Sequence, residues 1–147
     1  MKLVAGSMLL VAVVLSLAAC SGETVALAAT PPPLTIEKGE GEEPSRLTLS
    51  PKAAERLGIE TAAVAAAQLD GASRLVVPYA AVLYDPTGAT WAYTNPEGLV
   101  FIRAPITVER IDGDIAVLVS GPPAGTLVVT VGAPEFWGAE HGVGGGH

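Results

Sequence analysis

Residues 99–120 read LVFIRAPITVERIDGDIAVLVS, and this stretch decides the fold that the sequence predicts. Its runs of β-branched and other apolar residues favour strands over helices and lie at 99–103, 106–111 and 115–119. Pro105 separates the first two runs, and we expect it to break the strand there. Asp112, Gly113 and Asp114 form a tight turn between the second and third runs. The stretch therefore predicts antiparallel strands joined by a turn.

The same pattern extends over the rest of the chain. Further strand-like runs lie at 47–49, 75–77, 80–84, 90–94 and 127–131. They are separated by turn sequences, of which the strongest are Asp85-Pro86-Thr87-Gly88 and Asn95-Pro96-Glu97-Gly98, and by the Pro- and Gly-rich loop 121–125. Short strands at this spacing predict a mainly β fold, a small antiparallel β-roll or barrel.

One short helix is expected before these strands. Ser50 is a good N-cap, Pro51 suits the first helical position, and Gly58 favours the left-handed conformation that ends a helix. The helix should cover residues 52–57. The Ala- and Val-rich segment 59–69 is open to two interpretations, because alanine favours helix whereas Gly58 indicates a break.

Composition limits the classes of function. The chain has 147 residues, a formal net charge of −7, a single cysteine and two histidines. This acidic balance disfavours a nucleic-acid partner, which would need a basic surface. One cysteine cannot form a disulfide within the chain. Both histidines lie in the Gly-rich C-terminal segment, where a catalytic geometry is hard to hold, and the acidic residues among the strands sit at turns. We therefore expect no enzymatic activity.

The N-terminus has the pattern of an export signal. Lys2 precedes an apolar stretch at 3–19, and Leu17-Ala18-Ala19-Cys20 resembles the lipobox of bacterial lipoproteins. The resemblance implies cleavage before Cys20 and a diacylglyceryl lipid on its sulfur, which would anchor the protein in the membrane. The alternatives are an uncleaved membrane anchor and ordinary cleavage after Ala28. We expect an exported lipoprotein on the outer face of the cell membrane or in the periplasm.

These signals divide the chain into four parts. A signal peptide is expected at 1–19, and a disordered, Pro-rich and acidic linker, carrying the lipid at its first residue, at 20–46. The β domain follows at 47–132, and the Gly-rich segment at 133–147 should form a partly ordered tail.

Three sets of residues are candidates for function or packing. Glu140, His141 and His147 offer a carboxylate and two imidazoles, which suit zinc or copper, although the alternative is simply a flexible tail. Phe136-Trp137 either docks back on the domain or anchors a partner protein. Trp91 and Tyr93 alternate along a strand and so share one face, which favours core packing opposite residues 100 and 102.

The order of the β pieces resembles one family. Val77-Pro78-Tyr79-Ala80-Ala81-Val82, then residues 100–108, 113–117 and 120–129, resemble the membrane-proximal region of periplasmic adaptor subunits, the membrane fusion proteins of resistance-nodulation-division efflux systems. Residues 50–61 resemble the segment that enters this region. Only Thr61–Arg74 separates the two pieces, which leaves no room for the helical hairpin and lipoyl-like domain of a complete adaptor.

The resemblance implies a function without cofactors or catalytic residues. We expect a lipid-anchored accessory protein that acts by protein–protein contact with a transmembrane efflux transporter or with its full-length adaptor. The alternative is an envelope lipoprotein that binds a metal or a small ligand.

Overall fold

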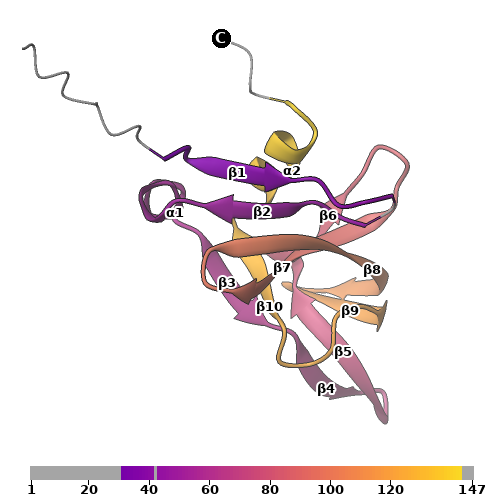
Figure 1. The fold of residues 1–147 in the computed structure, drawn as a ribbon. Helices are drawn as coiled ribbons and strands as arrows, with labels where there is room; N and C mark the ends of the chain where they lie inside the picture. The colour runs from indigo at the N-terminus through magenta and orange to yellow at the C-terminus, as the bar shows by residue number, and fades with distance from the viewer. Residues whose placement is uncertain (1–30, 42, 144–147) are drawn as a thin grey trace, which may run out of the picture.

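The computed structural model describes residues 31–41 and 43–143, and within them the chain is mainly β (Figure 1). The prediction of an antiparallel β fold is confirmed. The elements in chain order are β1 (Leu34–Glu37), β2 (Arg46–Leu49), α1 (Pro51–Leu57), β3 (Glu60–Ala63), β4 (Ala65–Leu69), β5 (Ala72–Pro78), the 3₁₀ turn η1 (Tyr79–Ala81), β6 (Leu83–Tyr84), β7 (Thr90–Glu97), β8 (Val100–Asp112), β9 (Ile115–Ser120), β10 (Leu127–Val131) and α2 (Ala133–Glu140).

The main sheet curls into a half-barrel. Its strand order is β3-β10-β7-β8-β9-β5-β4, and every pairing is antiparallel. The two strands at the ends of this order, β3 and β4, are consecutive in the chain and meet at Val64. The Val64 N–H donates to the Thr126 carbonyl, and the Val64 carbonyl accepts from the Gly125 N–H, both at 2.8 Å. The chain therefore leaves one edge of the sheet and joins the other.

Strand β8 is continuous through Pro105, so the predicted break there is wrong. Pro105 pairs with Trp91 of β7. On the other side of β8, β2 pairs with residues 100–102 and β9 with residues 107–112. Pro105 lies between these two ladders, where the missing N–H interrupts no pairing on that side. Strand β8 is therefore long enough to pair with β2 through its first part and with β9 through its last part.

Helix α1 forms as its capping residues predict. The Ser50 Oγ accepts a hydrogen bond from the Ala53 N–H at 3.2 Å, and Gly58 has a φ of 61°. This left-handed residue ends the helix, and segment 59–69 continues as β3 and β4, which decides the open alternative in favour of strand.

Both ends of the described chain contain more structure than predicted. Within the expected linker, β1 pairs antiparallel with β2, with Leu34 opposite Leu49. Within the expected tail, residues 133–140 form α2, so the described residues contain two helices instead of one. Each short element is stabilised by side chains that pack on the domain. No helix among the described residues is long and apolar enough to cross a membrane. The predicted signal peptide and Cys20 lie outside those residues.

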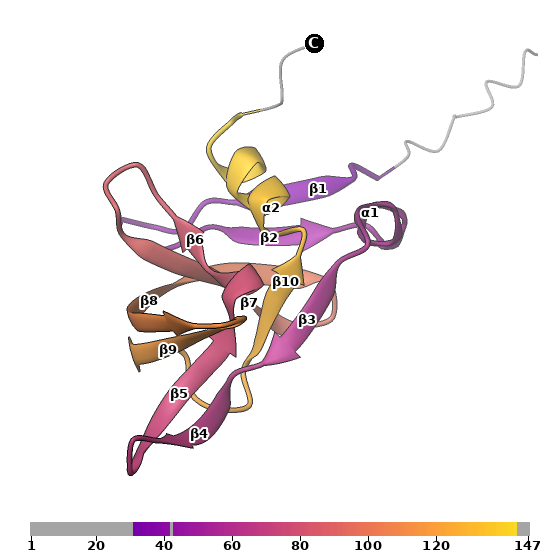
Figure 2. The same cartoon turned by 180° about the vertical axis from the view of Figure 1, so that it is seen from behind.

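Two hydrophobic clusters fill the molecule. The barrel core lies inside the curled sheet and consists of Val64, Val77, Ala81, Val82, Ala92, Ile106, Ala116, Leu118 and Val128. The end core lies under α2, β1 and β2 and consists of Leu47, Leu49, Tyr93, Phe101, Val129, Ala133 and Phe136. Both views place β1 and α2 at one end of the molecule and the β4–β5 hairpin at the opposite end (Figures 1 and 2).

Candidate functional site

Helix α2 is held against the sheet by Phe136. The helix begins after Gly132, whose φ of 98° turns the chain out of β10. A Cβ at Gly132 would lie 2.2 Å from the Ile59 Cδ1, so glycine also makes room for that contact. The Phe136 ring is 1% exposed, and its centroid lies 5.4 Å from that of Tyr93 and 4.6 Å from that of Phe101. The sequence left docking and partner contact open for this residue, and in the structure its ring is part of the end core.

A polar cluster joins the end of α2 to the sheet. The Tyr93 hydroxyl donates a hydrogen bond to the Glu140 Oε2 at 2.5 Å, and the Arg103 Nε lies 3.4 Å from the same oxygen. The side chains of Arg103 and Glu140 are 18% and 6% exposed. Burial raises the pKa of Tyr93 above its ordinary value, and the hydrogen bond to Glu140 and its negative charge add to this effect. Tyr93 therefore stays neutral, and its hydroxyl keeps the proton that it donates to the Glu140 carboxylate.

Two indole rings flank the Arg103 guanidinium. Its carbon lies 4.3 Å from the Trp91 ring centroid and 5.1 Å from that of Trp137. Trp137 stacks in turn on His141, with the ring centroids 4.0 Å apart. Cations are attracted to the faces of such rings, so this arrangement fixes the plane of the guanidinium.

The neighbours of Trp91 and Tyr93 differ from the sequence prediction. They pair with Pro105 and Arg103, instead of residues 102 and 100. An irregularity between Thr94 and Glu97 shifts the register, and the turn closes at residues 98–99. Asn95 stabilises this arrangement by donating from its Nδ2 to the carbonyls of residues 98 and 100. The shift is what brings Arg103 beside the aromatic rings.

A pocket opens beside this cluster. Its volume is about 480 Å³, and the residues that line it are Gly41, Glu43, Pro44, Ser45, Trp91, Arg103, Pro105 and Glu140. The buried Arg103 Nε makes no hydrogen bond within the described part of the chain. The pocket thus combines an aromatic wall with one cationic and two acidic side chains, which suits a small polar ligand with an apolar part.

The Asp85 turn borders the same aromatic face. The Asp85 Oδ1 accepts from the Thr87 hydroxyl at 2.7 Å and from the N–H groups of Thr87 and Ala89 at 2.8 and 2.9 Å, and its Oδ2 accepts from the Trp91 Nε1 at 3.2 Å. These bonds, above all that from the Thr87 hydroxyl, lower the pKa of Asp85 to about 2. They confirm the predicted turn and give its carboxylate a structural role, which is to orient the Trp91 indole.

The predicted metal ligands are only partly described. Glu140 is engaged by Tyr93 and Arg103, the His141 Nδ1 lies 2.9 Å from the Trp137 carbonyl oxygen, and His147 lies outside the described residues. Within the residues that the structure does describe, no group of three or more His, Cys, Asp or Glu side chains could hold a metal. The zinc or copper site stays a prediction. So does partner contact through Trp137, which is half-buried.

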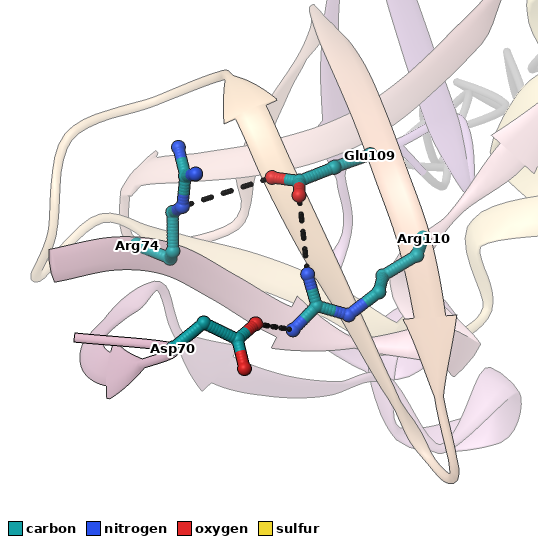
Figure 3. A network of polar contacts seen from close by, with 4 residues as sticks. All are labelled: Asp70, Arg74, Glu109 and Arg110. Atoms are coloured by element: carbon teal, nitrogen blue, oxygen red, sulfur yellow. Dashed lines mark hydrogen bonds and ion pairs between the residues drawn. The ribbon is translucent and has the colours of Figure 1, made fainter. Parts of the chain in front are cut away.

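At the opposite end of the molecule, the hairpin formed by β4 and β5 carries a network of ion pairs. The hairpin turns at Asp70 and Gly71, both with positive φ. Arg110 of β8 places its Nη2 2.9 Å from the Asp70 carboxylate and its Nη1 3.1 Å from Glu109 (Figure 3). Glu109 also faces the Arg74 Nε of β5 at 3.7 Å. The network ties the hairpin to β8.

Strand β4 has one unpaired edge within the described chain. Backbone groups alternate in direction along a strand, and those of Val64 point toward the β10 side. Those of Ala66 and Gln68 therefore point to the same side, away from β5, where they have no backbone partner among the described residues. Ala65–Leu69 contains no proline or charged residue, which are the residues that commonly prevent an edge strand from pairing with another chain. The sequence reasoning missed it because strand order is not a local property.

We compared the chain with known protein families, with curated proteins and with solved structures, and none of the three comparisons finds a match.

Proposed function

We propose that this protein is a lipid-anchored accessory protein that contacts a transmembrane efflux transporter or its full-length adaptor. The observation that carries the proposal is the surface at the hairpin end, which we call the hairpin surface. It consists of Asp70, Arg74, Glu109, Arg110 and Val119. Val119 is 63% exposed, and its strand β9 pairs with β5, beside the ion-pair network.

The composition of this surface favours a protein partner. Isolated exposed apolar residues are common, but here an exposed valine adjoins charged side chains that already hold one another in place. A patch with an apolar centre and a polar rim is typical of protein interfaces. Because the ion pairs connect β5 to β8, the partner would meet an ordered surface and lose less entropy on binding.

The position of the surface agrees with a lipid anchor on Cys20. The hairpin lies at the end of the molecule opposite β1, the first described strand (Figures 1 and 2). A lipid at Cys20 would tether the β1 end and leave the hairpin surface free to face a membrane protein. The adaptor-like order of the β pieces supports the same class of partner.

A photo-crosslinking residue at Val119 tests the contact. In intact membranes we expect Val119 to capture a transporter or a full-length adaptor, identified by mass spectrometry. Glu55 on α1 is the matched control, since it is also exposed but lies far from the hairpin. Capture of the same protein from both positions, or of neither class from Val119, would contradict the proposal.

The anchor is tested separately. Mass spectrometry of the mature N-terminal peptide should find Cys20 at the N-terminus with a diacylglyceryl group, and Cys20→Ser should release the protein from the membrane fraction. An unmodified Cys20 in the membrane-bound protein would leave the contact intact but overturn the anchor.

A second candidate is binding of a small polar ligand in the pocket beside Trp91, Arg103 and Glu140. The observation that favours it is the buried Arg103 Nε without a hydrogen bond in the described residues. The zinc or copper site predicted on Glu140, His141 and His147 is a separate proposal, which calorimetric titration with Zn²⁺ or Cu²⁺, repeated with His141→Ala/His147→Ala, tests. Equal heats from both proteins would exclude these ligands.

A further inference from the structure

The unpaired edge of β4 is self-complementary, and we propose that it pairs with β4 of a second copy of this chain. The pairing depends only on the direction of the backbone groups in β4 and on the residues of that strand. It is therefore independent of the proposed contact with a transporter.

The register of the proposed pairing follows from geometry. If two β4 strands meet antiparallel about a two-fold axis at Ala67, Ala66 of each copy faces Gln68 of the other. These are the two residues whose N–H and C=O groups point away from β5. An antiparallel hydrogen-bonded pair exchanges both of its N–H···O bonds, so all of these groups would be satisfied. The symmetric contact also closes upon itself.

The side chains of β4 permit this approach. The strand reads Ala65-Ala66-Ala67-Gln68-Leu69, so small residues lie at its centre and no like charges face each other in the register. Asp70 lies beyond the strand end, and the two-fold axis keeps it apart from Asp70 of the second copy. A strand of a different protein would need its own matching register, whereas the second copy provides one by symmetry.

Cysteine cross-linking tests the register. The two Ala67 residues would form a pair without mutual hydrogen bonds, with Cα atoms about 4.5 Å apart, which is within the range that a disulfide spans. Cys20 is the only cysteine of the chain, so in the full chain with Cys20→Ser, Ala67→Cys provides a single thiol. We expect mild oxidation to give a disulfide-linked dimer. Lys52→Cys on α1 should remain monomeric, although Lys52 is exposed and Ala67 is only half-exposed.

Two further variants address the edge itself. Ala66→Pro removes an N–H that points away from β5, so the ladder within the hairpin should survive while the dimer is lost. Gln68→Lys places a charge on the exposed edge and should also abolish the cross-link. Circular dichroism checks that each variant is folded, and Gln68→Lys keeps the test valid if Ala66→Pro does not fold.

Each outcome of the cross-linking experiment either supports or overturns the pairing. A cross-link at residue 67 that is lost in Gln68→Lys establishes the pairing. No cross-link in folded Ala67→Cys protein overturns it, as does cross-linking at residue 52 to the same extent, which would indicate random collision. If the dimer test fails, the expected capture of a partner from Val119 is unaffected, so the two proposals are tested independently.

Discussion

Arg103 and Arg110 leave the same strand, β8, and each contacts a carboxylate from a distant part of the sequence, yet their surroundings differ. Arg103 and Glu140 are 18% and 6% exposed, whereas Arg110 and Asp70 are 36% and 82% exposed. The 3.4 Å separation of the first pair is longer than the 2.9 Å of the second. Judged by distance alone, the Arg110–Asp70 pair would be expected to matter more for stability. We expect the opposite order, because the loss of a partner costs more where water cannot replace it.

The comparison extends to the two ends of the molecule. At the α2 end, aromatic rings fill the end core and polar groups are shielded. At the hairpin end the ion pairs are exposed, and the outer edge of β4 has no backbone partner within the part of the chain that the structure describes. We infer that the α2 end contributes mainly to stability and the hairpin end mainly to interactions. Three substitutions and one change of pH test this division.

The first prediction concerns Phe136→Ala. The ring fills the space between Tyr93 and Phe101, so its loss leaves a cavity and should lower the free energy of unfolding by about 3–5 kcal/mol. Urea denaturation followed by circular dichroism measures this. Val119→Ala, at an exposed position of the hairpin end, should change stability by no more than about 0.5 kcal/mol. Equal losses from the two variants would remove the distinction between the ends.

The second prediction concerns Glu140→Ala. This change leaves Arg103 without its carboxylate and the Tyr93 hydroxyl without its acceptor. We expect unfolding free energy to fall by about 1–3 kcal/mol, because both groups are largely shielded from water. A double-mutant cycle with Arg103→Met separates the ion pair from the tyrosine hydrogen bond. No measurable loss would show that α2 is held by its apolar side chains alone.

The third prediction concerns alkaline pH. The folded-state pKa of Tyr93 is raised above its ordinary value of 10.0, so the protonated form favours folding. This contribution is fully present below pH 10 and is lost as the pH rises further. Unfolding free energy should therefore fall less steeply above pH 10 in Tyr93→Phe than in the unchanged protein.

The fourth prediction is the smallest effect. Asp70→Asn removes the exposed partner of Arg110 and should cost less than about 1 kcal/mol. Added salt should reduce even this difference, since exposed charges are screened. Chemical denaturation with urea at low and high NaCl provides the measurement. A loss as large as that of Glu140→Ala would mean that the hairpin network is a structural element comparable to the α2 cluster.

Local signals in the sequence determined much of the fold. The Ser50 cap, the Gly58 stop, the Asp85 turn and the turn at residues 112–114 were predictable, because each depends on groups a few residues apart. Strand β10 also coincides with its predicted range of 127–131. Of the candidate site residues, Phe136 and Glu140 were identified, but their contacts were not.

Tertiary structure decided the rest. The sequence could not show that β8 passes through Pro105, since this depends on which strands lie on its other side. Nor could it place Arg103 between two indoles, because an irregularity near residue 95 shifts the register that local patterning predicted. The unpaired edge of β4 likewise follows from strand order, which depends on long-range pairing. Turns and caps are fixed by neighbours in the chain, whereas registers, edges and buried polar contacts are fixed by neighbours in space.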